Sequence, residues 1–309
     1  MNHVAGENSR NAALEFACHQ TLRTSKYEEH KGRNPDPVEG TCKWILGHNT
    51  FTTWRTLMSG FIWISADLSC GKSVLSKFLV DNELKSNESR TTCYFFFKSG
   101  GDADQRSVDN ALCALLHQLF SQRPSLIKYA IPDFKANGPQ LPTLFNALWS
   151  ILLTAASDEQ CGETVCILDG LDVLRQPDCE RLCLKLTQFY GRTPSHRSST
   201  LKFIVTSRPY LTLERSFAEI THLVPSIRLA GEKEYTFISR EINLVIEYRC
   251  RVLAVKMSWN TSLHIYFINR LLSIPHRTYL WLYLIFEVIE HHLRPSTEEV
   301  LEGKSGRIW

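Results

Sequence analysis

The chain has 309 residues, of which 43% are hydrophobic, 22% charged and 11% aromatic. This length fits one large domain or two, and the apolar content is sufficient for a sizeable core. The formal net charge of +3 is small for the length, so it indicates no polyanion-binding surface and nucleic acid is not an expected partner.

The ten cysteines are scattered and form no CxxC pair, so their spacing indicates neither a zinc site nor a thioredoxin-like motif. The first residues lack the apolar core of a signal peptide. The most apolar late stretch, residues 279–290, is too short for a bilayer of about 30 Å. We therefore expect a soluble, cytoplasmic protein with reduced thiols and no membrane span.

The predicted elements follow one another along the chain and are separated by breaks in the hydrophobic pattern. Residues 1–38 are polar and weakly periodic, and are expected to be a poorly ordered segment that ends in a proline- and glycine-containing linker. Residues 41–57 fit one or two short helices. Apolar runs predict strands at 61–65, 90–97, 164–168, 201–206 and near 226–231, and helical spacing predicts helices from Lys72 onward and at 106–120, 144–156 and 180–190.

Strands that alternate with helices of this length predict an α/β fold, with a parallel sheet covered by helices on both faces. The strand sequences are continuously apolar, as fully buried parallel strands are. After Gly231 the pattern becomes helical, with segments at 232–255, 262–272 and 276–293. The predicted domains are therefore an α/β domain at 39–230 and a helical region at 231–309 with a frayed tail.

The stretch SADLSCGKSV joins the first predicted strand to a helix and has the spacing of a phosphate-binding loop. Ala66 replaces the usual first glycine, and Gly71 allows the backbone to approach a phosphate. Lys72 has the charge for the outer phosphates, and Ser73 has the hydroxyl for Mg²⁺. The residues expected to bind the nucleotide are Ala66, Ser69, Cys70, Gly71, Lys72, Ser73 and Val74.

Two features weigh on this motif. Leu68 places an apolar side chain at the loop tip, where it must turn away from the phosphates. The tripeptide Gly-Lys-Ser recurs at 303–305, but no strand precedes it and Glu298 stands at the first-glycine position. The second copy is therefore not expected to function.

Polar residues also end two later predicted strands. Asp169 directly follows the strand TVCIL, and Arg208 is the second residue after the strand LKFIVT. Ligands of open parallel sheets bind at the carboxyl ends of the strands, so both residues are expected to face the crevice that holds Lys72. Asp169 is the candidate second Mg²⁺ ligand beside Ser73. Asp172 is the candidate residue that orients or activates the attacking water, and Arg208 is the candidate reader of a γ-phosphate.

With these three motifs in family order, the sequence resembles the NACHT-type nucleotide-binding module of the STAND class of signal-transduction ATPases. In particular it resembles the fungal group described as nephrocystin-3-like N-terminal domains. The resemblance covers roughly residues 39–292. The blocks that carry it are GTCKWI, FIWISADLSCGKSVLSKFLVD, TTCYFFF, NALCALLHQLF, CILDGLD, LKFIVTSRPY and IPHRTYLWLYL.

The resemblance implies a P-loop NTPase fold and a switch that ADP holds closed and ATP opens, with homo-oligomerisation on activation. By matching position it implies that Gly71, Lys72 and Ser73 bind the phosphates and Mg²⁺, and that Asp169 is the Mg²⁺-linked carboxylate and Arg208 the phosphate sensor. The family usually has glutamate where this chain has Val173, so only slow ATP hydrolysis, or none, is expected. The absence of effector and repeat regions suggests a truncated member or a fragment.

Three hypotheses remain open at this stage. The chain is either such a switch or a non-catalytic interaction module that keeps the fold without the nucleotide. A P-loop kinase is a third hypothesis, although the sequence shows no acceptor-site signature. His276 is a further candidate for coupling the helical region to the nucleotide, with a core or surface role as the alternative.

Overall fold

A computed structural model describes residues 2–68, 70–191, 200–211, 213–215, 217, 226–229, 232–275 and 277–292. The chain forms two compact units. The first comprises Met1–Pro37, Ile45–Leu68 and Lys72–Leu229, and the second comprises Val38–Trp44, Ser69–Gly71 and Ala230–Trp309. The second unit thus takes in two short pieces that the sequence analysis assigns to a continuous α/β domain.

The first unit is built on a five-stranded parallel sheet with the strand order β2-β3-β4-β1-β5. The predicted α/β class is confirmed, and so is the parallel sheet. β4 lies between β1 and β3, which are far apart in the sequence, so the carboxyl ends of these three strands form one edge. The strands are β1 (Gly60–Ala66), β2 (Arg90–Phe96), β3 (Glu163–Asp169), β4 (Leu201–Ser207) and β5 (Ser226–Leu229).

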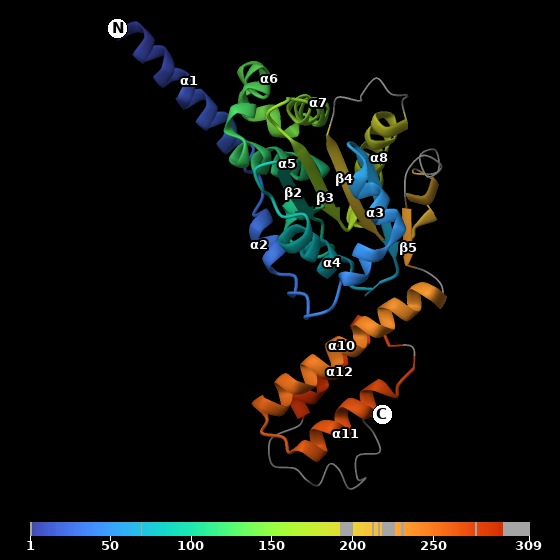
Figure 1. Cartoon of the computed structure of the whole chain (residues 1–309). Helices are drawn as coiled ribbons and strands as arrows, with labels where there is room; N and C mark the ends of the chain where they lie inside the picture. The colour runs from blue at the N-terminus through green and yellow to red at the C-terminus, as the bar shows by residue number, and fades with distance from the viewer. Residues whose placement is uncertain are drawn as a thin grey trace. The chain divides into compact units, whose positions relative to one another are not determined.

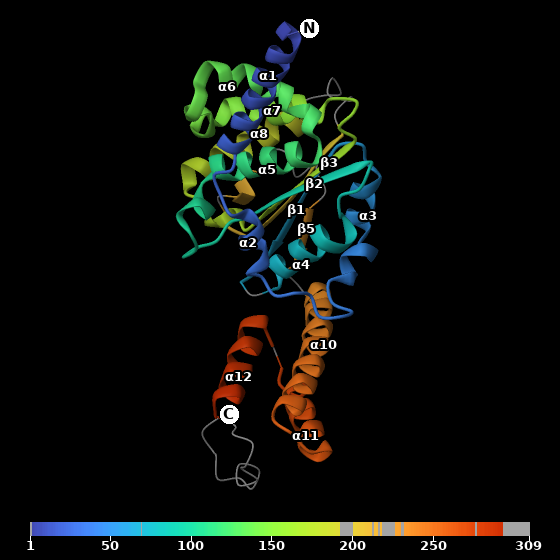
Figure 2. The same cartoon turned by 90° about the vertical axis from the view of Figure 1, so that its left-hand side faces the viewer.

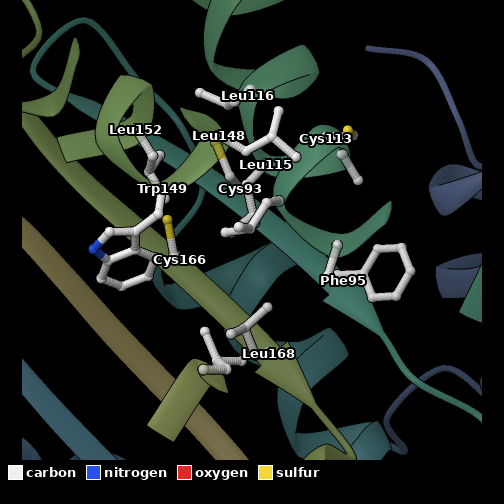
Figure 3. Close-up of a cluster of buried hydrophobic side chains, with 14 of the residues drawn as sticks. Cys93, Phe95, Cys113, Leu115, Leu116, Leu148, Trp149, Leu152, Cys166 and Leu168 are labelled. Atoms are coloured by element: carbon white, nitrogen blue, oxygen red, sulfur yellow. The ribbon is translucent and has the colours of Figure 1, made fainter. Parts of the chain in front are cut away.

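One face of the sheet carries the larger part of the core. Apolar side chains of β2 and β3 pack there against α5 (Val108–Gln122) and α7 (Phe145–Ala156). Figure 3 shows side chains of both helices gathered against Cys93, Phe95 and Cys166. The apolar stripe that predicts α5 from its sequence is the stripe that is buried, because a helix covers a sheet with one face only.

The opposite face of the sheet is buried as well. Ile62, Ile167 and Ile204 have almost no exposed surface, and they alternate along their strands with the residues of the first face. α3 (Asn49–Thr56) contacts β1 on this side, and α4 (Lys72–Phe78) contacts β3 and β4. In Figures 1 and 2, α3 and α5 lie on opposite sides of the sheet. Burial on both faces explains the continuous apolar runs.

The N-terminal segment differs from the expectation of a poorly ordered, polar stretch. It contains α1 (Asn2–Thr21) and α2 (Tyr27–Gly32). Cys18, Leu22 and Tyr27 are buried in the core of the first unit. Only a few apolar side chains of residues 2–32 are buried in this core, so their sequence has no helical hydrophobic pattern. Figure 1 shows the start of α1 extending away from the sheet.

Among the described residues of the second unit, three helices pack around their own apolar core, which includes Ile246, Phe267 and Phe286. None of the helices described here has the length and apolar character needed to cross a membrane. The helices of this unit are α10 (Glu232–Lys256), α11 (Thr261–Leu272) and α12 (Tyr279–His292). The remaining elements are η1 (Lys43–Gly47), the π-helical turn η2 (Leu79–Glu83), η3 (Ala103–Arg106), η4 (Pro124–Tyr129), α6 (Ile131–Asn137), η5 (Gly138–Thr143), η6 (Leu171–Val173) and α8 (Gln176–Gly191).

Candidate functional site

The chain between β1 and α4 forms a loop that closes around its own lysine. The Nζ of Lys72, the first residue of α4, donates hydrogen bonds to the carbonyl oxygens of Ala66 and Asp67 at 2.7 and 2.8 Å. Gly71 has a φ of 75°, in the left-handed region that only glycine enters without strain. The glycine before the lysine is therefore required by the backbone itself.

The other predicted loop residues have different surroundings. Ala66 ends β1 and is fully buried. Its φ is not positive, so the conformational freedom of the usual glycine is not needed there. Leu68 at the loop tip is 60% exposed. Cys70 and Val74 are half-buried, and Ser69 lies outside the described residues.

Asp169, the last residue of β3, joins the loop region to the middle of the sheet. Its Oδ2 accepts a hydrogen bond of 2.6 Å from the Ser73 hydroxyl of α4. Its Oδ1 accepts hydrogen bonds from Ser76 of α4 at 2.8 Å and from Thr206 of β4 at 2.6 Å. The carboxylate is thus held by hydroxyl groups from two elements and is only 3% exposed.

The surroundings of Asp169 match the chemistry of a magnesium site. Burial raises the pKa of Asp169, and the hydrogen bonds from the hydroxyls and the charge of Lys72 oppose this only in part. In the described part of the chain, no lysine or arginine forms an ion pair with this carboxylate. A carboxylate and a serine hydroxyl are hard oxygen ligands of the kind that Mg²⁺ prefers. Ser73 and Asp169 are therefore the residues that fit the ion.

Arg208 and Asp172 form a second polar pair at the same edge. The backbone N–H and the Nε of Arg208 donate to the two carboxylate oxygens of Asp172 at 2.9 and 2.6 Å. The Asp172 side chain is 4% exposed, whereas that of Arg208 is 33% exposed. Asp172 and Arg208, which are separate candidates in the sequence, are thus hydrogen-bonded to each other.

The strand register places Arg208 beside the loop. Ser207 pairs with Ser65 across β4 and β1, so Arg208, the residue after β4, lies at the level of Ala66, the last residue of β1. The structure therefore brings the loop, Asp169 and Arg208 to one edge of the sheet, as expected for a parallel arrangement. His276, the candidate from the helical region, lies outside the described residues.

Two residues of this cluster, Ser76 and Thr206, are absent from the sequence-based set. Both side chains are fully buried and donate to Asp169. A signal existed in each case, since Ser76 follows Ser73 by one helical turn and Thr206 is a polar residue at the end of an apolar strand. Neither signal identifies the acceptor, because that requires the strand order.

This geometry, a loop that encloses its lysine beside a buried strand-end aspartate, defines the class of protein as a P-loop NTPase-type α/β module. The family model described as "Nephrocystin 3, N-terminal" matches residues 40–208, more than half of the chain. The chain belongs to this family, which confirms the resemblance seen in the sequence. A second model, described as a domain of unknown function (DUF7069), matches residues 238–302.

Among curated proteins, the chain is similar to "Vegetative incompatibility protein HET-E-1" of Podospora anserina. The two are 27% identical over 280 residues, which is 88% of this chain and 20% of the relative. The chain thus spans about a fifth of that protein's length. The similarity supports the NACHT/STAND type.

Proposed function

We propose that this chain is a NACHT/STAND-type signalling switch that binds ATP or ADP with Mg²⁺ and hydrolyses ATP slowly or not at all. The observation that carries the proposal is the 2.6 Å hydrogen bond between Ser73 and Asp169. It joins the residue after the loop lysine to a carboxylate from a strand that is not adjacent to β1. A nucleotide site needs this pairing of hydroxyl and carboxylate to hold Mg²⁺ next to the phosphates.

Each loop residue has a role that follows from its contacts. Gly71 keeps the backbone clear of a Cβ where the phosphates approach. Lys72 exchanges the carbonyl oxygens of Ala66 and Asp67 for phosphate oxygens. Ser73 and Asp169 hold Mg²⁺, which supplies positive charge against the phosphates when bound.

Slow hydrolysis is proposed because this chain offers no second carboxylate where its family usually has one. Val173 follows Asp172 and packs against the hydrophobic core of the first unit. An apolar side chain cannot accept a proton from water. The nucleotide then acts as a timer of the switch, and its state changes mainly by exchange.

The signalling part of the proposal rests on the likeness to the incompatibility protein of Podospora anserina. We propose that nucleotide exchange drives self-association of the chain and that the switch works in the cytoplasm.

Thermal unfolding with and without nucleotide tests the proposal. A ligand that binds only the folded state at a hundredfold excess over Kd stabilises it by about 2.7 kcal/mol. We expect Mg-ATP and Mg-ADP to raise the melting temperature of the wild type and to leave that of Lys72→Ala unchanged. Lys135→Ala, which removes an exposed lysine of α6, is the matched control and should respond as the wild type does.

The second candidate function is an interaction module that has lost the nucleotide. The specific observation in its favour is the loop itself, because Leu68 stands at the tip and Lys72 is already bound to loop carbonyls. If neither nucleotide changes the melting temperature of the folded wild type, this second function replaces the first.

A further inference from the structure

The contact between Asp172 and Arg208 is more specific than a surface ion pair. Asp172 receives the backbone N–H and the Nε of the same arginine, one on each carboxylate oxygen. Such a two-point contact fixes both the start of the side chain and the inner edge of its guanidinium group. The arginine has little rotational freedom left beyond that edge.

The outer edge of the same guanidinium is available for a ligand. In the part of the chain that the structure describes, Nη1 and Nη2 of Arg208 have no hydrogen-bond partner, and the group lies 5.3 Å from the ring centroid of Tyr210. The Arg208 side chain is 33% exposed. Two parallel N–H donors at a fixed position match two oxygens of a terminal phosphate.

The turn that carries Asp172 is itself held in place. Gly170, at the start of this turn, has a φ of 79° and donates its N–H to the backbone oxygen and the hydroxyl of Thr206. Asp172 and Arg208 are thus attached to neighbouring strand ends that are bonded to each other. The carboxylate has a fixed position from which to orient the arginine.

We infer that Asp172 is a positioning residue, which aims Arg208 at the terminal phosphate of a nucleoside triphosphate, and not the group that activates the attacking water. This inference rests on the proposed nucleotide function and deepens it. A water-activating carboxylate must face the water, but both oxygens of Asp172 face Arg208 and its side chain is 4% exposed. The consequence is that Asp172 acts on the preference for ATP over ADP.

The test measures the Kd of Mg-ATP and Mg-ADP by calorimetry for the wild type, Asp172→Asn, Arg208→Ala and the double variant. Losing a hydrogen bond between charged groups weakens binding by about tenfold, so we expect this loss for Mg-ATP in both single variants. The Kd of Mg-ADP should not change. The double variant should be no weaker than Arg208→Ala, because both substitutions remove the same contact.

Asp178→Asn is the matched control. Asp178 forms an ion pair of 2.8 Å with Arg181 on the surface of α8, so its loss should leave both affinities unchanged. If Asp172→Asn fails to fold, Asp172→Glu takes its place. It keeps the charge but shifts the carboxylate by one methylene group, and the same selective loss of Mg-ATP affinity is expected.

The outcomes separate the two proposals. If the wild type binds nucleotide and Asp172→Asn keeps its affinity for Mg-ATP while losing turnover, Asp172 activates water and the positioning role is overturned alone. Additive losses in the double variant overturn it as well. If the folded wild type binds neither nucleotide, the proposed function fails first and the positioning role fails with it.

Discussion

The two ends of strand β3 each carry a carboxylate, the half-buried Glu163 and the buried Asp169, and the two have different partners. Glu163 at the amino end accepts a hydrogen bond of 2.7 Å from Lys202 and a further one from Arg90. Burial raises the pKa of Glu163, but these two cations outweigh it and the net pKa is lowered. Asp169 at the carboxyl end receives only hydroxyl donors, and burial raises its pKa. The carboxylate at the amino end of β3 is thus neutralised by ion pairs, whereas the one at the carboxyl end is compensated only in part, by hydroxyl donors and the charge of Lys72.

The difference teaches how to separate a structural charge from a functional one. Lys202 is 2% exposed and also donates to the carbonyl oxygen of Arg55 at 2.9 Å. The charged groups at the amino end of β3 therefore find their partners within the protein. At the carboxyl end the hydrogen-bond donors are hydroxyl groups and the charge of Lys72 offsets the burial of Asp169 only in part, so the charged carboxylate costs stability unless a ligand supplies a cation. Perturbed groups of this kind concentrate at functional sites.

The largest expected effect is at the amino end. Lys202→Met removes a buried cation and leaves Glu163 with Arg90 alone, so the free energy of unfolding should fall by about 3 kcal/mol. Urea denaturation measures this loss. Lys128→Met is the control, because Lys128 pairs with Asp158 at 2.8 Å but its own side chain is 54% exposed, so the change should affect stability little. Equal losses of unfolding free energy in Lys202→Met and Lys128→Met would contradict a structural role for the charges at the amino end of β3.

A smaller effect of opposite sign is expected at the carboxyl end. Asp169→Asn keeps an acceptor for the hydroxyls and removes a carboxylate whose charged form is disfavoured by burial, so without nucleotide the free energy of unfolding should rise at pH 7. The same variant should lose all stabilisation by Mg-ATP. Glu163→Gln is the matched change at the other end of β3 and should lower stability. A destabilised Asp169→Asn that still responds to Mg-ATP would contradict the magnesium assignment.

The smallest expected effect is the pH dependence of the change in unfolding free energy that Asp169→Asn and Glu163→Gln each cause. The folded-state pKa of Asp169 lies above its ordinary value of 3.8, so stability from this group is lost as pH rises through that pKa. The advantage of Asp169→Asn should therefore grow with increasing pH. The pKa of Glu163 lies below its ordinary value of 4.5, so the deficit of Glu163→Gln should shrink as pH falls below that value. If the stability of Asp169→Asn and Glu163→Gln changes with pH in the same way, the two ends of β3 do not differ as described.

The sequence predicts most of the sheet and part of the site. The apolar runs locate β1, β3 and β4 to within one or two residues, and the phosphate-loop spacing identifies Lys72 and Ser73. The strand order is not predictable from these runs, because strands buried on both faces lack the alternating pattern that would distinguish their neighbours. Without the order, the position of β4 between β1 and β3 is unknown, and so are the donors that Thr206 and Ser76 provide to Asp169.

The Asp172–Arg208 contact and the N-terminal helices were missed for different reasons. The two charged residues are 36 apart in sequence, and no local pattern links them. The helices at residues 2–32 follow no apolar periodicity, since only a few of their side chains reach the core. Local patterns predict elements that bury a whole face, but not contacts made by single side chains.

The last two residues of β4 and Arg208 after it each form a side-chain hydrogen bond with a different partner. Thr206 donates to Asp169 of β3, Ser207 accepts from the Nε1 of Trp63 of β1 at 2.8 Å, and Arg208 is bound to Asp172. A segment held on three sides opens only when all three contacts break together. The backbone amides of these residues should therefore exchange with solvent at the rate of the sheet interior, although they lie at its functional edge.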